Sequence, residues 1–160
     1  YLQCALVLQH PAEAEKLGRA LAAMMPGVEA TVVLSPALGG LIIGHEVARA
    51  LGVRAMFAEC VDGVLTLRRG FDLTPEDRVV VVEDVVTTGG STRETMEVAR
   101  AAGATVVAAA AVINRSAYAS PVDVPFAAMA AITPPTYTPD ACPLCAQGFP
   151  VTKPGSRPGK

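Results

Sequence analysis

The sequence contains no tryptophan, few other aromatic residues and few cysteines. Aromatic side chains make up 4% of the 160 residues and apolar side chains 51%, so we expect a core of alanine, valine and leucine, as in layered α/β proteins. The four cysteines, of which only two are close together, do not form a disulfide framework. We therefore expect the chain to work in the reducing environment of the cytoplasm.

An excess of positive charge and long apolar runs are also missing. The formal net charge is −2, which provides no electrostatic basis for binding nucleic acid or a membrane surface. No apolar run reaches the length of a membrane span. We therefore expect small molecules as ligands, and neither nucleic acid nor a membrane as a partner.

The length of the chain suits one domain with a sizeable core. We expect a single domain over 1–160, in which 133–160 forms a tail rich in proline and glycine. Because the sequence opens on Tyr1 and not on methionine, we also expect that a further N-terminal segment precedes it.

The stretch over 79–92 carries the main chemical signal. Four consecutive valines at 79–82 predict a strand that is buried on both faces and ends at Glu83 and Asp84. A short loop of threonine, glycine and serine follows, and 93–102 is predicted to be a helix. Ligands of open α/β sheets bind at the carboxyl ends of strands, and such a loop can direct backbone N–H groups at an anion. We therefore predict that 83–91 holds a sugar phosphate.

In this interpretation the loop binds the phosphate and the two acids accept hydrogen bonds from ribose hydroxyls, or recruit a metal ion. Neither the P-loop with its Gly-Lys-Ser/Thr nor the Rossmann motif G-x-G-x-x-G occurs. The alternative is an ordinary strand–turn–helix whose acids are solvated. A pair of acids at the end of an apolar strand needs a partner, which favours the binding site.

This stretch resembles the motif with which type I phosphoribosyltransferases bind phosphoribosyl pyrophosphate (PRPP): a hydrophobic strand, two acids and a short loop of hydroxyl residues and glycine. The resemblance implies an α/β fold in which helices flank a central, mostly parallel sheet that carries a flexible hairpin loop. It also implies a set of PRPP-binding residues: Glu83, Asp84, Val85, Val86, Thr87, Thr88, Gly89, Gly90 and Ser91.

A second strand–loop–helix unit precedes this motif. Residues 31–34 are predicted to be a strand, 35–40 a loop and 41–51 a helix, so the loop should open on the same edge of the sheet. The resemblance implies that Leu38 and Gly39 contact pyrophosphate through their backbone. The alternative is a plain turn between a strand and a helix. The remaining regular segments are a helix over 11–25 and strands over 54–60, 105–113 and 126–132.

The segment 61–70 contains Asp62-Gly63, a hairpin signal, followed by Arg68 and Arg69. It resembles the mobile catalytic loop of the family, which closes over PRPP, so Arg68 and Arg69 are candidate catalytic residues for the departing pyrophosphate. The alternative is a solvated surface hairpin. Cys60 departs from the family pattern, because orotate enzymes tend to place lysine or arginine near this position.

The strand over 105–113 is followed by Asn114-Arg115-Ser116. An arginine placed there can fork onto a planar carboxylate or a base edge, or it can simply pair with a surface acid. The dipeptide resembles the Asn/Asp-Arg with which orotate phosphoribosyltransferases contact the pyrimidine. The resemblance implies that Arg115, with a hydroxyl or amide near Thr87, orients orotate.

The resemblance to this branch covers nearly the whole chain and implies a reaction. Ribose 5-phosphate passes from PRPP to orotate, giving orotidine 5′-phosphate and pyrophosphate in pyrimidine biosynthesis. The family uses Mg²⁺, held by PRPP oxygens and water without a direct protein ligand, and its members are homodimers. Two alternatives stay open: a phosphoribosyltransferase for a purine or uracil, and a non-catalytic PRPP-binding regulator.

The tail includes the C-x-x-C sequence Cys142-Pro143-Leu144-Cys145. Such a pair is half of a zinc site, and neither Cys4 nor Cys60 has a spacing that completes it. A thioredoxin-like redox motif would open a helix after a strand, a context that we do not expect here. The third interpretation is a structural turn, which the resemblance of the tail to that of orotate enzymes with short catalytic loops favours.

Overall fold

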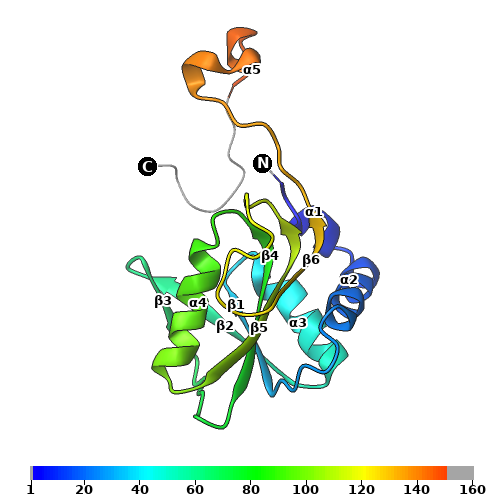
Figure 1. The fold of residues 1–160 in the computed structure, drawn as a ribbon, viewed down its shortest axis with the longest axis vertical. Coiled ribbons are helices and arrows are strands. Elements are labelled where there is room, and N and C mark those ends of the chain that lie inside the picture. Colours follow the sequence, from blue (N-terminus) through cyan, green and yellow to red (C-terminus); the bar gives the residue numbers. More distant parts are fainter. Residues whose placement is uncertain (1, 151–160) are drawn as a thin grey trace.

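The computed structural model describes residues 2–150. Within them a six-stranded sheet has the order β3-β2-β1-β4-β5-β6 (Figure 1). The edge strand β3 runs antiparallel to β2, and all other neighbouring strands are parallel. The strands are β1 Val32–Pro36, β2 Arg54–Val61, β3 Val64–Leu67, β4 Arg78–Val86, β5 Thr105–Asn114 and β6 Phe126–Ala131.

Helices cover both faces of the sheet (Figure 1). One face carries α2 and α3, the opposite face carries α4, and the short α5 stands away from the sheet at the end of an extended segment. The helices are α1 Ala5–Leu8, α2 Pro11–Ala23, α3 Gly40–Leu51, α4 Gly90–Ala101 and α5 Pro143–Ala146, with a 3-10 turn η1 at Pro139–Ala141. Within residues 2–150, none of the helices combines the length and the apolar character that crossing a bilayer requires.

The valines of β4 show how the core is divided. Val80 and Val82 pack in the cluster under α2 and α3, whereas Val79 and Val81 pack with Met96 of α4. Successive side chains of a strand point to opposite faces, and both faces of this sheet are covered by helices. All four valines are therefore fully buried. The predicted strand with two buried faces is therefore confirmed, and so is the predicted fold class.

The order of the strands reverses between β1 and β4. The chain leaves β1 through α3 to reach β2 on one side, and leaves β4 through α4 to reach β5 on the other. Such a switch point opens a crevice at the carboxyl ends of the two central strands. The loops that follow β1 and β4 lie at this crevice, as predicted for loops that open on one edge.

Several features of the elements near the site and the tail differ from the predictions. Strand β4 continues through Val86 instead of ending at the acids, because its parallel pairing with β5 extends to Val86 opposite Asn114. Helix α4 begins at Gly90 and not at Arg93, since Gly89 adopts a left-handed conformation with φ of 76° that admits an early helix start. The cysteine pair does open a helix, α5, but that helix has four residues and follows a 3-10 turn.

The N-terminal and C-terminal segments are described in part. The N-terminal segment contains the short helix α1. The predicted tail over 133–160 is described as far as residue 150, and its remainder lies outside the described residues together with Tyr1.

Candidate functional site

The loop after β1 packs directly on the end of β4. A Cβ atom added to Gly39 would lie 2.7 Å from Asp84 Oδ1, and one added to Gly40 would lie 2.9 Å from the carbonyl oxygen of Val82. A larger residue at Gly40 would have to displace the backbone of β4, and one at Gly39 would have to displace the carboxylate of Asp84. The peptide bond between Ala37 and Leu38, in the same loop, is cis. The two predicted binding loops are therefore in contact at the switch point.

Glu83 faces α4 and joins it to the end of the strand. Its side chain is 8% exposed, Ser91 Oγ donates to Oε1 at 2.6 Å, and Thr92 Oγ1 donates to Oε2 at 2.5 Å. Both hydroxyls come from the first turn of α4, so the carboxylate fixes where the helix starts relative to β4. Glu83 thereby shapes the loop over 87–89 that spans the two elements.

Asp84 faces the opposite side of the strand, toward Gly39. Its Oδ1 atom accepts the backbone N–H of Val85 at 2.8 Å. Burial raises the pKa of Asp84, and the N–H groups of Val85 and of Asp84 itself oppose that shift. The Sγ atom of Cys4 lies 4.0 Å from the Asp84 carbonyl oxygen. Burial and the charge of Asp84 raise the pKa of Cys4 to about 11. Cys4 is therefore a neutral thiol at neutral pH.

The phosphate-loop candidate over 87–91 presents Thr87 and Thr88 to solvent at the start of α4. The Gly90 N–H lies 3.4 Å from Thr88 Oγ1, and the hydroxyl groups and N–H groups of this loop lie where the positive end of the helix dipole begins. Hydroxyl and backbone N–H groups are the donors that an anion requires, so the loop remains a candidate phosphate site.

The side chain of Arg93 hydrogen-bonds to this loop, a role that the sequence analysis missed. Its Nη1 atom donates to the carbonyl oxygen of Thr88 at 3.0 Å and to that of Pro121 at 2.8 Å. The arginine thus ties the loop after β4 to the segment after β5. One signal was available: a basic residue in the first turn of a helix opposes the helix dipole, so it needs a reason to be there.

Arg115 lies beside the same loop. Its backbone N–H donates to the carbonyl oxygen of Val86 at 2.7 Å, which places it next to Thr87. Within residues 2–150, its Nε atom is buried without a hydrogen-bond partner. Asn114, 5% exposed, shapes the turn by accepting the Ser116 N–H and donating to the Tyr118 carbonyl oxygen, both at 2.9 Å. The structure therefore places the backbone of Arg115 next to the phosphate-loop candidate and leaves its Nε atom without a hydrogen-bond partner among the described residues.

The two arginines of the hairpin point elsewhere. The hairpin itself forms as predicted: Asp62 and Gly63, both with positive φ, join strands that pair as Val61 with Val64. Arg69 donates through Nε to Glu59 Oε1 at 2.7 Å, and Arg68 Nη1 lies 3.8 Å from Glu59 Oε2. The structure does not bring either guanidinium to the phosphate-loop candidate.

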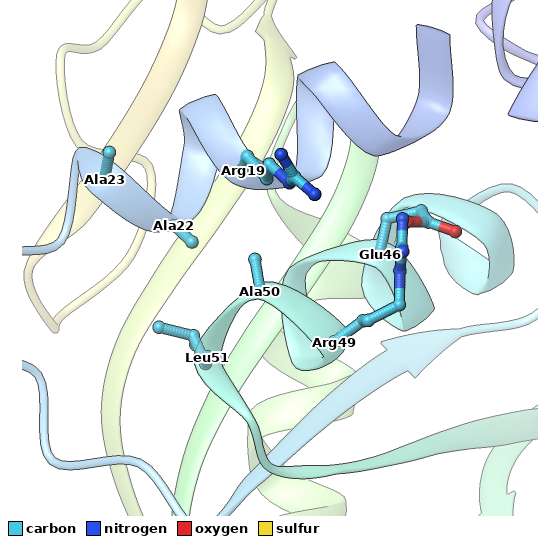
Figure 2. A pocket seen from close by; sticks show the side chains of 7 residues that line it. All are labelled: Arg19, Ala22, Ala23, Glu46, Arg49, Ala50 and Leu51. Carbon is cyan, nitrogen blue, oxygen red and sulfur yellow. The ribbon is translucent and has the colours of Figure 1, made fainter. Parts of the chain in front are cut away.

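A hollow of about 560 Å³ lies away from the switch point, between α2 and α3. Figure 2 shows small apolar side chains at one end of this hollow and charged ones at the other. Arg49 pairs there with Glu46 at 2.5 Å, which satisfies the charges locally. The lining residues are Arg19, Ala22, Ala23, Glu46, Arg49, Ala50 and Leu51. The hollow therefore offers no reactive group.

An open, mostly parallel sheet with helices on both faces, whose switch point brings two glycine-bearing loops and an acid together, defines a doubly wound α/β protein, a class in which ligands bind at this point. Residues 6–133 match the family described as "Phosphoribosyl transferase domain". An orotate phosphoribosyltransferase of Pelotomaculum thermopropionicum is 54% identical over 98% of this chain and 83% of its own length. The enzyme of the same description from Carboxydothermus hydrogenoformans is 50% identical over the same shares of the two chains.

A solved structure shows the likeness in fold. Orotate phosphoribosyltransferase of Mycobacterium tuberculosis, crystallised in complex with PRPP, has a TM-score of 0.70 at 23% identity, covering 82% of this chain and 80% of that one. The chain belongs to the phosphoribosyltransferase family, among the orotate phosphoribosyltransferases.

Proposed function

We propose that this protein transfers ribose 5-phosphate from PRPP to orotate, giving orotidine 5′-phosphate and pyrophosphate. The names of the relatives that are about half identical favour orotate over a purine or uracil, and an enzyme over a PRPP-binding regulator. The observation that carries the proposal is Arg115, whose backbone lies next to Thr87 and whose Nε atom has no hydrogen-bond partner among residues 2–150. Orotate carries the planar carboxylate that such a guanidinium pairs with.

PRPP would bind across the two loops. The backbone N–H groups and hydroxyls over 87–91 would receive the 5′-phosphate, and Asp84 would accept hydrogen bonds from the ribose hydroxyls. Glu83 was predicted to share that second role, but its carboxylate already accepts the hydroxyls of Ser91 and Thr92. We therefore assign it a positioning role: it holds the loop in the shape that receives the phosphate.

The pyrophosphate would lie over Leu38 and Gly39, whose loop contacts Asp84. Within residues 2–150, no group of three or more histidine, cysteine or acidic side chains is placed to hold a metal ion. A magnesium ion held by PRPP oxygens and water, as the sequence resemblance implies, would need no such group of protein ligands. The ion would offset the charge that grows on pyrophosphate as it leaves.

The reaction itself asks for charge stabilisation more than for a protein nucleophile. Cleavage of the bond between C1 of the ribose and pyrophosphate leaves positive charge on the sugar ring, and the attacking atom is a ring nitrogen of orotate. The carboxylate of Asp84, fixed beside the sugar, would stabilise the positive charge. Arg68 and Arg69 stay candidates for the pyrophosphate side, provided that the hairpin releases them from Glu59.

We also propose a cellular compartment and an oligomeric state for the enzyme. The thiols of all four cysteines are free, which suits the reducing cytoplasm as the compartment. A homodimer, as in the family that the sequence resembles, would cover exposed apolar side chains such as Leu6 and Val7, which are 65% and 48% exposed.

The test is a direct assay. The protein is mixed with PRPP, Mg²⁺ and orotate, and the loss of orotate absorbance is followed in the ultraviolet. Parallel reactions receive uracil, hypoxanthine or adenine in place of orotate. We expect turnover that depends on PRPP and is restricted to orotate. Turnover of another base at a higher kcat/KM would contradict the substrate, and PRPP binding without any turnover would contradict the enzymatic role.

A further inference from the structure

The cysteine pair of the tail plays no part in the site described above. Cys142 and Cys145 are free, partly exposed thiols on a turn that stands away from the sheet (Figure 1). We call residues 142–148 the knuckle. A solvent-facing pair of thiols on a protruding turn is available to a metal ion or to another chain.

Backbone hydrogen bonds hold both cysteines of the knuckle on one turn. The Ala146 N–H donates to the Cys142 carbonyl oxygen at 3.0 Å, and the Gly148 N–H donates to the Cys145 carbonyl oxygen at 2.9 Å. Two cysteines separated by two residues on such a turn have the spacing of half of a structural zinc site.

One chain supplies only half of the ligands that zinc requires. Zinc in a structural site is tetrahedral and takes four ligands, commonly thiolates. Over the described range 2–150, no group of three or more possible ligands occurs. Cys4 is buried in the core under α2 and α3, and Cys60 lies on β2 opposite Leu65 of the hairpin. The missing two ligands must come from another molecule, and a second copy of this chain carries the same pair.

The surface next to the pair suits contact with an identical knuckle. Leu144 and Phe149 are large apolar side chains, and 58% and 60% of their surface is exposed to water in the single chain. The Phe149 N–H donates to the Leu144 carbonyl oxygen at 3.1 Å, which holds the two residues on the same turn. Two knuckles related by a two-fold axis would bury these side chains around a shared metal.

We propose that Cys142 and Cys145 form half of a zinc site that the same two residues of a second copy complete. The site is a tetrahedron of four thiolates on the two-fold axis, which selects zinc over the oxygen-preferring Mg²⁺. Each of the four thiols loses its proton to solvent as its bond to zinc forms, with no change of oxidation state. The inference does not depend on the proposed enzymatic activity.

The experiment measures how much zinc the protein holds. The full chain is purified under reducing conditions, exposed to zinc and freed of loosely bound metal. Zinc per chain is then measured by mass spectrometry of the element, and the mass of the intact assembly by native mass spectrometry. We expect one zinc ion per two chains. Cobalt in place of zinc should give the visible spectrum of tetrahedral thiolate coordination at the same ratio.

Variants locate the site. The double variant Cys142→Ser with Cys145→Ser should lose the metal, and Cys60→Ser, which also removes an exposed thiol, should retain it. Thermal unfolding of the metal-free forms checks that the double variant still folds. Retention of zinc by the double variant, one zinc ion per single chain, or a reduced wild-type protein that holds no zinc would each overturn the proposal.

Discussion

At the scale of single residues, two adjacent acids have different surroundings because a strand alternates its side chains. Glu83 is directed at the hydroxyls of α4, and Asp84 at the loop after β1. The sequence predicts that both lie at the binding edge, because a pair of acids after four valines is a local signal. It does not predict which acid is already hydrogen-bonded, because the partners depend on where α4 starts.

The substitution Asp84→Asn should lower the activity of the protein and raise its stability. Loss of the charged acceptor for the ribose hydroxyls should lower kcat by about 10- to 100-fold, the range expected for a charge-assisted hydrogen bond of about 1.5–3 kcal/mol. Because burial raises the pKa of Asp84, the ionised carboxylate costs stability above that pKa. The variant should therefore have a higher Tm than the wild type at pH 8, and the gain should shrink as the pH falls and Asp84 takes up its proton.

Steady-state kinetics and calorimetry at pH 8 and pH 5 check this pair of effects. A variant with unchanged kcat would show that Asp84 does not contact the sugar.

Arg115→Ala tests the base side of the site. The substitution should raise the KM for orotate by about 10- to 100-fold, as expected for the loss of a bidentate charged pair, and leave the KM for PRPP nearly unchanged. Initial rates with each substrate varied in turn measure both constants. Equal losses for the two substrates would place Arg115 in a general structural role instead.

At the scale of secondary-structure elements, local patterns are predictable and contacts between elements are not. Local patterns predict that α2, α3 and β4 exist and where each of them begins, to within one residue. The extension of β4 to Val86 depends on pairing with β5, more than twenty residues away along the chain. In the same way the pairing of Ala58 with Leu67, which carries Arg68 and Arg69 to Glu59, is set by the register of the hairpin.

The bridge made by Arg93 is the contact between elements that has the clearest functional consequence. It holds the carbonyl oxygens of Thr88 and Pro121, so Arg93→Ala should loosen the phosphate-loop candidate and raise the KM for PRPP by about tenfold, at a cost of about 1.4 kcal/mol. The matched control is Arg19→Ala, an exposed arginine that pairs with Glu15 on α2. Kinetics of both variants at saturating orotate test the expectation. Equal KM values for PRPP in the two variants would contradict it.

At the scale of the whole molecule, a buried acid connects three strands at their amino ends, which lie opposite the site. Asp77, 5% exposed, accepts the Thr31 hydroxyl and the Thr74 N–H, each at 2.9 Å, and pairs with Arg54 at the start of β2. Burial alone would raise the pKa of Asp77, but the bonds from Arg54, Thr74 and Thr31 outweigh it and lower the pKa to about 2. The acid therefore joins β1, β2 and β4 at their amino ends.

Asp77→Asn should cost about 2 kcal/mol of unfolding free energy at pH 7, the size expected when donors lose a charged acceptor. A depressed pKa contributes stability above the pKa of the unfolded chain, and that contribution is lost as the pH falls toward 2. The difference from the wild type should thus shrink below pH 4. Urea unfolding at pH 7 and pH 3 measures it, and a difference that grows at pH 3 would contradict the ion-pair account.

We propose above all that the loop after β4 holds the phosphate of PRPP while Asp84 contacts its ribose. The most direct measurement is a crystal structure of the protein with PRPP and Mg²⁺. We expect the 5′-phosphate on the N–H groups over 87–91 and the ribose hydroxyls at Asp84. PRPP bound elsewhere, beside an ordered and empty loop, would contradict it.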